Sequence, residues 1–173
     1  MLSVMRAMLA AIGVGRIETH ESPAEALDAM TRSVPDLVIA AATMQPVTGP
    51  EFISTMRHVD NGPLCFVPAM ITSAHAKPGV VAEALRAGAH QVFVLPTSAS
   101  TLYRRLDWLL NDDRPFERRG DQYVVAGLEE RLALRALRPA YAPSPARPPL
   151  AVGETKKAPG ALPYVLKVRG AQN

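Results

Sequence analysis

The sequence predicts an α/β domain built on a doubly wound parallel sheet, followed by a Pro-rich extension. Between residues 1 and 112, apolar runs of strand length alternate with segments whose apolar residues recur at helical spacing. This alternation is typical of a parallel sheet with right-handed crossover helices. Seven prolines then lie between Pro139 and Pro163, a density that favours an extended, mostly disordered chain. We therefore expect a domain at 1–112 and an extension at 113–173.

The first segments predict a helix, a strand and a second helix. Apolar residues recur at helical spacing over residues 1–12, and Gly13 suits the end of that helix. A short strand is expected at 16–20. The tetrapeptide Ser-Pro-Ala-Glu at 22–25 has an N-cap serine, a first-turn proline and the glutamate of a capping box. It therefore predicts a helix at 23–31.

A central strand and its crossover helix come next. The run at 34–42 is almost continuously apolar, as in a parallel strand that is covered on both faces. A helix is expected at 49–59. Three of its residues should face inward, and these are Phe52, Ile53 and Met56.

The same alternation continues through the rest of the domain. Strands are expected at 64–71 and 92–95, and the single cysteine, Cys65, should be a buried, inert thiol in the first of them. A helix is expected between them at 80–87. Ser98 should cap the last helix, whose inward stripe would consist of Leu102, Leu106, Leu109 and Leu110.

Six short motifs occur in order along this domain. They are Arg6-Ala-Met-Leu9, Pro35-Asp-Leu-Val38, Met44 to Gly49, Ser73-Ala74, Ala84-Leu-Arg-Ala-Gly-Ala89 and Leu95-Pro96. In type and spacing they resemble the receiver domain of bacterial response regulators in two-component signalling. The resemblance runs from Met1 to about Leu110 and implies the flavodoxin-like fold of CheY-like proteins.

The resemblance also implies a phosphorylation site, which this sequence has lost. In the family, an Asp accepts the phosphoryl group, an acidic pair after the first strand helps to hold Mg²⁺, a Lys steadies the phosphate, and a Thr or Ser hydroxyl bonds to it. Ala41 stands in the position of the Asp and Leu95 in that of the Lys, so Ser73 alone keeps its chemistry. Val92 replaces the family's aromatic switch residue. We expect no phosphoacceptor, metal or cofactor at this degenerate site.

The first strand of the receiver fold has no counterpart, because residues 1–12 already match the first helix. That strand would lie between the second and third strands, so its loss would leave backbone groups unpaired inside the sheet. Three explanations are open. The start site was assigned too late, which we favour; another segment of the chain closes the gap; or a partner or second copy supplies the strand. The alternating segment from Tyr164 to Val168 is the candidate for the second explanation.

The extension carries the basic character of the chain. Residues 1–112 have a net charge of −2 and residues 113–173 of +5. A short helix is expected at 128–137, and its basic stripe could bind nucleic acid or an acidic partner. Two neighbouring glutamates dilute the charge and favour a solvated face instead. The stripe consists of Arg131, Arg135 and Arg138.

Other chemical signals are weak. The four histidines are not spaced as a metal site would require, and His75 is of interest only because it follows Ser73-Ala74. No phosphate-binding loop, catalytic triad or paired carboxylates can be placed at one end of the sheet. No apolar run approaches the ~20 residues that span a bilayer. We expect a cytoplasmic protein without enzymatic activity. The remaining histidines are His20, His58 and His90.

These observations favour a non-phosphorylatable pseudo-receiver that acts by protein–protein contact in a phosphorelay. Its partner would be a histidine kinase, a phosphotransfer protein or another signalling protein, and a homodimer stays open. The implied surface comprises the family's fourth helix, fifth strand and fifth helix, with Tyr103, Arg104 and Asp107. The alternative is a receiver-like scaffold whose basic extension binds nucleic acid or an acidic partner.

Overall fold

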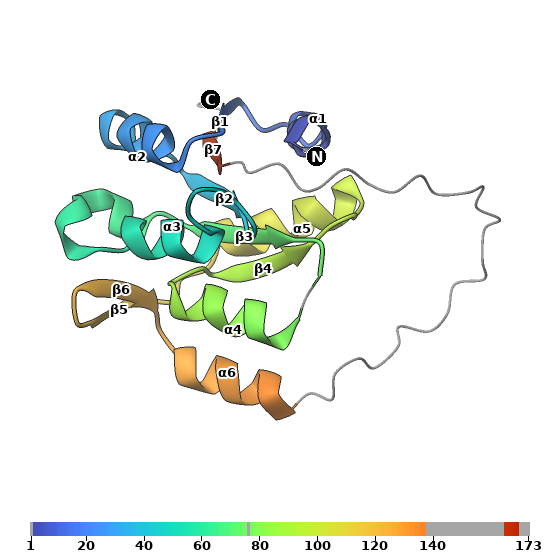
Figure 1. Cartoon of the computed structure of the whole chain (residues 1–173). Helices are drawn as coiled ribbons and strands as arrows, with labels where there is room; N and C mark the ends of the chain where they lie inside the picture. Colours follow the sequence, from blue (N-terminus) through green and yellow to red (C-terminus); the bar gives the residue numbers. More distant parts are fainter. Residues whose placement is uncertain (1, 76, 138–164, 170–173) are drawn as a thin grey trace.

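The chain forms one five-stranded sheet with helices packed around it and a separate two-stranded hairpin (Figure 1). The computed structural model describes residues 2–75, 77–137 and 165–169. Its elements in chain order are α1 (Leu2–Ala11), β1 (Arg16–His20), α2 (Pro23–Arg32), β2 (Leu37–Ala41), α3 (Gly49–Met56), the 3-10 segment η1 (Val59–Phe66), β3 (Ala69–Ser73), α4 (Pro78–Arg86), β4 (Gln91–Val94), α5 (Ala99–Leu110), β5 (Phe116–Arg119), β6 (Gln122–Val125), α6 (Leu128–Leu137) and β7 (Val165–Arg169).

The predicted α/β alternation is confirmed from α1 to α5, and β2, β3 and β4 are parallel. The helix starts follow the predicted caps. The side chains of Ser22 and Ser98 accept hydrogen bonds from the third backbone N–H of α2 and α5. The capping box predicted at 22–25 was wrong in part, since only its serine half is formed. A reciprocal capping box is found at α3, where Thr48 Oγ1 accepts from the Glu51 N–H and Glu51 Oε2 accepts from the Thr48 N–H.

Two further expectations, about one strand and one helix face, were wrong in detail. The strand expected at 64–71 begins only at Ala69, because Gly62 has a φ of 52° and Pro63 lacks an N–H, so η1 occupies residues 59–66. The predicted leucine stripe of α5 holds for three leucines, whereas Leu110 at the helix end is 54% exposed.

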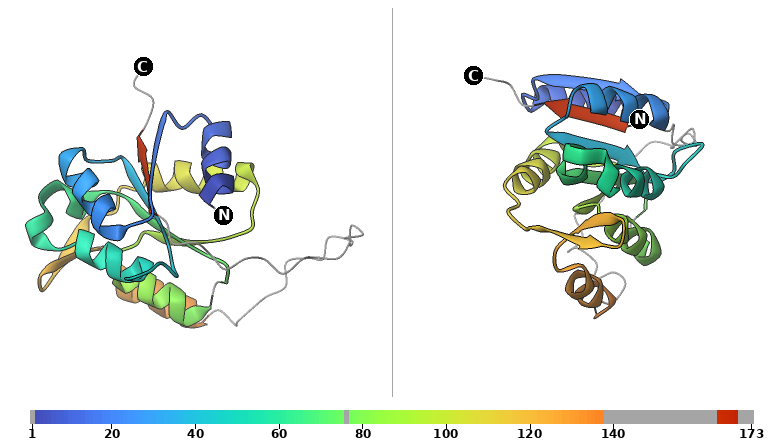
Figure 2. Two further views of the ribbon diagram at one scale, coloured as in Figure 1. Left: turned by 45° about the horizontal axis from the view of Figure 1, so that its top comes forward. Right: turned by 90° about the vertical axis from the view of Figure 1, so that its left-hand side faces the viewer.

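The gap left by the missing first strand is filled by β7 (Figure 2). This strand is antiparallel to both neighbours, and Val165 pairs with His20 on one side and Ala40 on the other. A segment of the chain itself, the one named in the second explanation, therefore pairs in the gap. The explanation by a late start site stays a prediction. The pairing of β7 also makes the sheet mixed rather than fully parallel, because a backbone ladder can be completed by a strand of either direction.

The extension contains more structure than its composition predicts. A hairpin, β5–β6, was missed, because its first strand, Phe-Glu-Arg-Arg, is mostly charged and does not alternate. The predicted helix at 128–137 is present as α6. The Pro-rich stretch predicted to be disordered lies outside the described residues. The boundary at 112/113 stays a prediction, although β7 joins the sheet of the first part.

The core has two parts. The larger cluster fills the space around the sheet, where β2 is buried along its whole length. A smaller cluster joins α4 and β6 to α6, which lies alongside α4 (Figure 1). No described helix has the length and apolar character needed to cross a membrane.

Candidate functional site

The degenerate site lies at the carboxyl ends of β2, β3 and β4. Ala41 is in register with Thr72, and the next residue, Ala42, donates its N–H to the Thr72 carbonyl at 2.7 Å. On the other side of β3, the Leu95 N–H donates to the Ser73 carbonyl at 2.9 Å. The backbone therefore brings Ala41, Ser73 and Leu95 to neighbouring strand ends, as their sequence positions imply.

Apolar, buried side chains occupy three positions at this edge. Ala41 is 4% exposed and Leu95 is 7% exposed, and Met44 of the following loop is also buried. The loop folds back closely, since a Cβ at Gly49 would lie 2.3 Å from the Ala41 carbonyl oxygen. The residues at the sequence positions of the family's nucleophile and cation are thus both apolar and buried.

Ser73 keeps its hydroxyl, but that hydroxyl is used within its own loop. Its Oγ donates to the His75 carbonyl at 2.8 Å and accepts from the His75 N–H at 3.2 Å. The serine therefore holds the turn after β3. His75 takes part in this turn through its backbone, and its side chain is exposed.

The residues at this edge do not fit a magnesium ion. Alanine and leucine offer no side-chain donor, and β7, which replaces the first strand, contains no Asp or Glu between Val165 and Arg169. Among the described residues, no group of three or more His, Cys, Asp or Glu side chains could hold a metal.

Val92, at the switch position on β4, lies beneath the chain's own extension. It is half-buried and packs against the main core as well as the cluster of Val81, Leu85, Val124 and Leu128. Valine lacks the aromatic ring that the resemblance implies for the switch position.

The predicted partner surface is divided by α6. Tyr103, Arg104 and Asp107 are all exposed on α5, with Tyr103 at 53%. Trp108 and Leu110 on the same helix are also about half exposed. On the α4 side, however, α6 covers the helix. Of the surface implied by the resemblance, α5 remains open.

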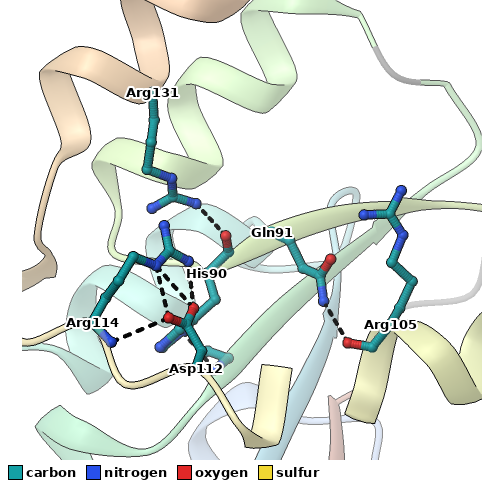
Figure 3. A network of polar contacts seen from close by, with 7 residues as sticks. His90, Gln91, Arg105, Asp112, Arg114 and Arg131 are labelled. Atoms are coloured by element: carbon teal, nitrogen blue, oxygen red, sulfur yellow. Dashed lines mark hydrogen bonds and ion pairs between the residues drawn. The ribbon is translucent and has the colours of Figure 1, made fainter. Parts of the chain in front are cut away.

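A charged network at the opposite, amino end of the strands was missed by sequence reasoning (Figure 3). Arg114 donates hydrogen bonds to the Asp112 carboxylate, and Arg131 of α6 donates to the His90 carbonyl. Gln91 donates to the carbonyl of Arg105 at 3.0 Å. These contacts tie the extension to the start of β4 and the end of α5.

Arg57, at the end of α3, is the fully buried member of this region. Its Nε donates to Gly88 O at 3.0 Å and its Nη1 to Cys65 O at 2.7 Å. Its guanidinium lies 4.8 Å from the centre of the Phe116 ring in β5. Burial lowers the pKa of Arg57 to about 9. Nothing in the local sequence distinguishes this arginine from an exposed one.

His90 is the buried histidine of the four. Its Nδ1 accepts from the Ala69 N–H at 3.2 Å, which joins the starts of β3 and β4. Burial, followed by the positive charge of Arg57, lowers the pKa of His90 to about 3. Hydrogen bonds from Arg114 lower the pKa of the neighbouring Asp112. His90 is therefore neutral at physiological pH and acts as a structural acceptor.

Of the predicted basic stripe, the structure describes the side chain of Arg131 alone. Arg131 is directed to the His90 carbonyl rather than to solvent. The side chain of Arg135 and all of Arg138 lie outside the described residues. Cys65 is buried as predicted and donates to the His58 carbonyl at 2.8 Å.

Comparison with known proteins identifies relatives of the fold. The family model for the response regulator receiver domain matches residues 1–107. Among solved structures, the receiver domain of sensor histidine kinase PA1611 from Pseudomonas aeruginosa, with magnesium in its active-site cleft, has a TM-score of 0.58 at 21% identity, covering 64% of this chain and 88% of that one. The chemotaxis protein CheY4 of Vibrio cholerae has a TM-score of 0.57 at 24% identity, covering 62% and 87%. The receiver domain of NtrX from Brucella abortus has a TM-score of 0.56 at 20% identity, covering 64% and 90%.

Proposed function

This chain belongs to the response regulator receiver domain family, and we propose that within it the chain is a pseudo-receiver. It would take part in two-component signalling by binding other signalling proteins, without being phosphorylated. The observation that carries this proposal is the burial of Ala41 and Leu95, at 4% and 7% exposure, in the places of the nucleophile and its cation.

The chemistry of the remaining groups supports this reading. A phosphoryl acceptor needs a nucleophile with a neighbouring base or metal. At this edge the only hydroxyl carried over from the family belongs to Ser73, and it is bonded to the backbone of His75. The described residues at the family's acceptor and cation positions therefore offer neither a carboxylate nor an ammonium group to stabilise a transferring phosphate.

A surface suited to protein contacts remains on α5. Tyr103 and Trp108 are about half exposed, and Arg104 and Asp107 lie beside them. Aromatic and arginine side chains are the residue types that most often dominate protein–protein binding energy. We propose this helix as the contact for a histidine kinase or a phosphotransfer protein.

A titration of the ¹⁵N-labelled full chain with purified phosphotransfer and histidine-kinase domains tests the proposal. The largest shift changes are expected on α5, with the same affinity in the presence and absence of acetyl phosphate. Tyr103→Ala should weaken binding at least tenfold, whereas the matched control Ser73→Ala should leave it unchanged. Shift changes centred on Ala41, Ser73 and Leu95, or no binding to either class of domain, would contradict the proposal.

A further inference from the structure

Two arginines of the extension have guanidinium groups that point toward one another near the start of β4 (Figure 3). Arg131 of α6 donates to the His90 carbonyl, and Arg114 donates from its Nε and Nη2 to the Asp112 carboxylate. Among the described residues, none accepts a hydrogen bond from the Nη1 of Arg114. This nitrogen is therefore available to a ligand.

The charges around these two groups do not balance. Burial lowers the pKa of His90 most, three guanidinium groups lower it further, and one carboxylate raises it. Because His90 itself is neutral, three positive charges stand here against one negative charge. Like charges in a partly buried place repel one another, and a bound anion relieves that repulsion. The groups that act on His90 are Arg57, Arg114, Arg131 and Asp112.

Arg57 adds to the positive field from inside the domain. It is fully buried, donates to backbone carbonyls and lies 4.8 Å from the centre of the Phe116 ring. Its Nη2 is buried and has no hydrogen-bond partner in the described part of the chain. No carboxylate of the described residues forms an ion pair with it. A buried positive charge of this kind favours an anion at the nearest position that solvent reaches.

Arg114 connects the two guanidinium groups to solvent. Its side chain is 28% exposed, whereas the Asp112 side chain that it binds is 4% exposed. Its guanidinium lies 5.2 Å from the centre of the Trp108 ring, and Trp108 is about half exposed. Arg131 is partly buried. An anion can therefore approach Arg114 from solvent.

We propose that Arg114 and Arg131 form a binding site for a phosphate dianion, supplied as inorganic phosphate or by a small phosphomonoester. Each guanidinium is a planar fork of N–H donors that matches two oxygens of a phosphate group. Two negative charges on the ligand match the excess of positive charge, to which Arg57 contributes without a contact. The site lies at the amino end of the strands, away from the degenerate site, and does not rest on the proposed function.

The single tryptophan of the chain, Trp108, reports on this site because Arg114 packs against its ring. The full-length chain is titrated with inorganic phosphate at an ionic strength held constant with sodium chloride. We expect a saturable change in tryptophan emission and a higher midpoint of thermal unfolding, since a ligand that binds the folded state stabilises it. Sodium chloride alone should produce neither.

Substitution of Arg131 tests the contact. Arg131→Gln should weaken phosphate binding at least tenfold, because it removes one of the two guanidinium groups. The matched control Arg105→Gln removes an exposed arginine of α5 that points away from Arg114 and Arg131 in Figure 3, and it should bind like the wild type. Arg131→Lys keeps the charge without the planar fork and should weaken binding about threefold. It keeps the test decisive if Arg131→Gln does not unfold cooperatively.

A parallel titration with glycerol 3-phosphate distinguishes the two sources of the phosphate group. Tighter binding of this compound would identify a phosphomonoester as the ligand, and tighter binding of inorganic phosphate would identify the free ion. The proposal would be overturned if neither compound gave a saturable change with the wild-type chain. Equal weakening by Arg131→Gln and Arg105→Gln would also overturn it, because binding would then depend on net charge alone.

Discussion

The two ends of the sheet have opposite chemistry. At the carboxyl end, Ala41, Met44 and Leu95 form a buried apolar edge. At the amino end, Arg57 and His90 are buried among backbone carbonyls and amides, beside the ion pair of Asp112 with Arg114. Receivers of the family place their charged groups at the carboxyl end. Here the buried polar groups hold the extension against the domain, which indicates that they serve structure rather than phosphoryl transfer.

The largest effect is expected at the amino end, from Arg57→Ala. The substitution leaves a cavity and removes the donor to the carbonyls of Gly88 and Cys65. The free energy of unfolding should fall by about 4 kcal/mol, as measured by urea denaturation. Arg86→Ala, at an exposed arginine of α4, is the control and should change it by no more than about 0.5 kcal/mol. Equal losses in both variants would show that Arg57 is not a structural centre.

At the carboxyl end, Ala41→Asp restores the family's residue type at a buried position. A carboxylate there is buried without a cation, so the free energy of unfolding should fall by about 3 kcal/mol. Thr43→Asp, in the exposed part of the same loop, should have little effect. If Ala41→Asp were as stable as the wild type, this edge would be able to solvate or pair a carboxylate.

Acidification should weaken the amino end. His90 is neutral in the folded chain with a pKa of about 3, whereas an unfolded histidine has a pKa of about 6.5, so the unfolded state gains a proton first as the pH falls. Between pH 7 and pH 5 this should cost about 2 kcal/mol of unfolding free energy. His90→Asn retains an acceptor for the Ala69 N–H. Its free energy of unfolding should lack the loss of about 2 kcal/mol between pH 7 and pH 5. An identical pH dependence in both proteins would contradict the account.

The smallest effect is expected from Thr48→Ala, next to the degenerate site. Thr48 forms the capping box of α3 with Glu51, and loss of the cap should cost about 1 kcal/mol. The expected loss comes from the start of α3, where the Thr48 side chain accepts a hydrogen bond from the Glu51 N–H. The measurement is the midpoint of thermal unfolding, with Thr43→Ala as the control variant. An unchanged midpoint for Thr48→Ala would show that the cap contributes nothing to stability.

Sequence patterns predicted most elements of the domain because each had a local cause. The caps at Ser22 and Ser98 and the apolar run of β2 depend only on neighbouring residues. The place of β7 in the sheet depends on pairing with strands that are distant in the sequence, which local patterns do not determine. The local hairpin β5–β6 was missed because its first strand is mostly charged. The degenerate site could be located because strand ends converge, whereas Arg57 and His90 meet only through the fold.

The insertion of β7 also has a direct test in solution. Backbone N–H groups of Val165–Arg169 pair with two flanking strands. They should therefore exchange slowly with deuterium, at rates like those of β2. Rapid exchange in this segment would show that β7 is not paired in the sheet in solution. A different segment would then have to lie between β1 and β2.

Intact mass spectrometry after incubation with acetyl phosphate and Mg²⁺ tests the central claim most directly. The account predicts that the wild-type chain gains no phosphoryl group, because Ala41 and Leu95 supply neither nucleophile nor cation. A stoichiometric, acid-labile phosphoryl group that disappears when any one aspartate is replaced would contradict it.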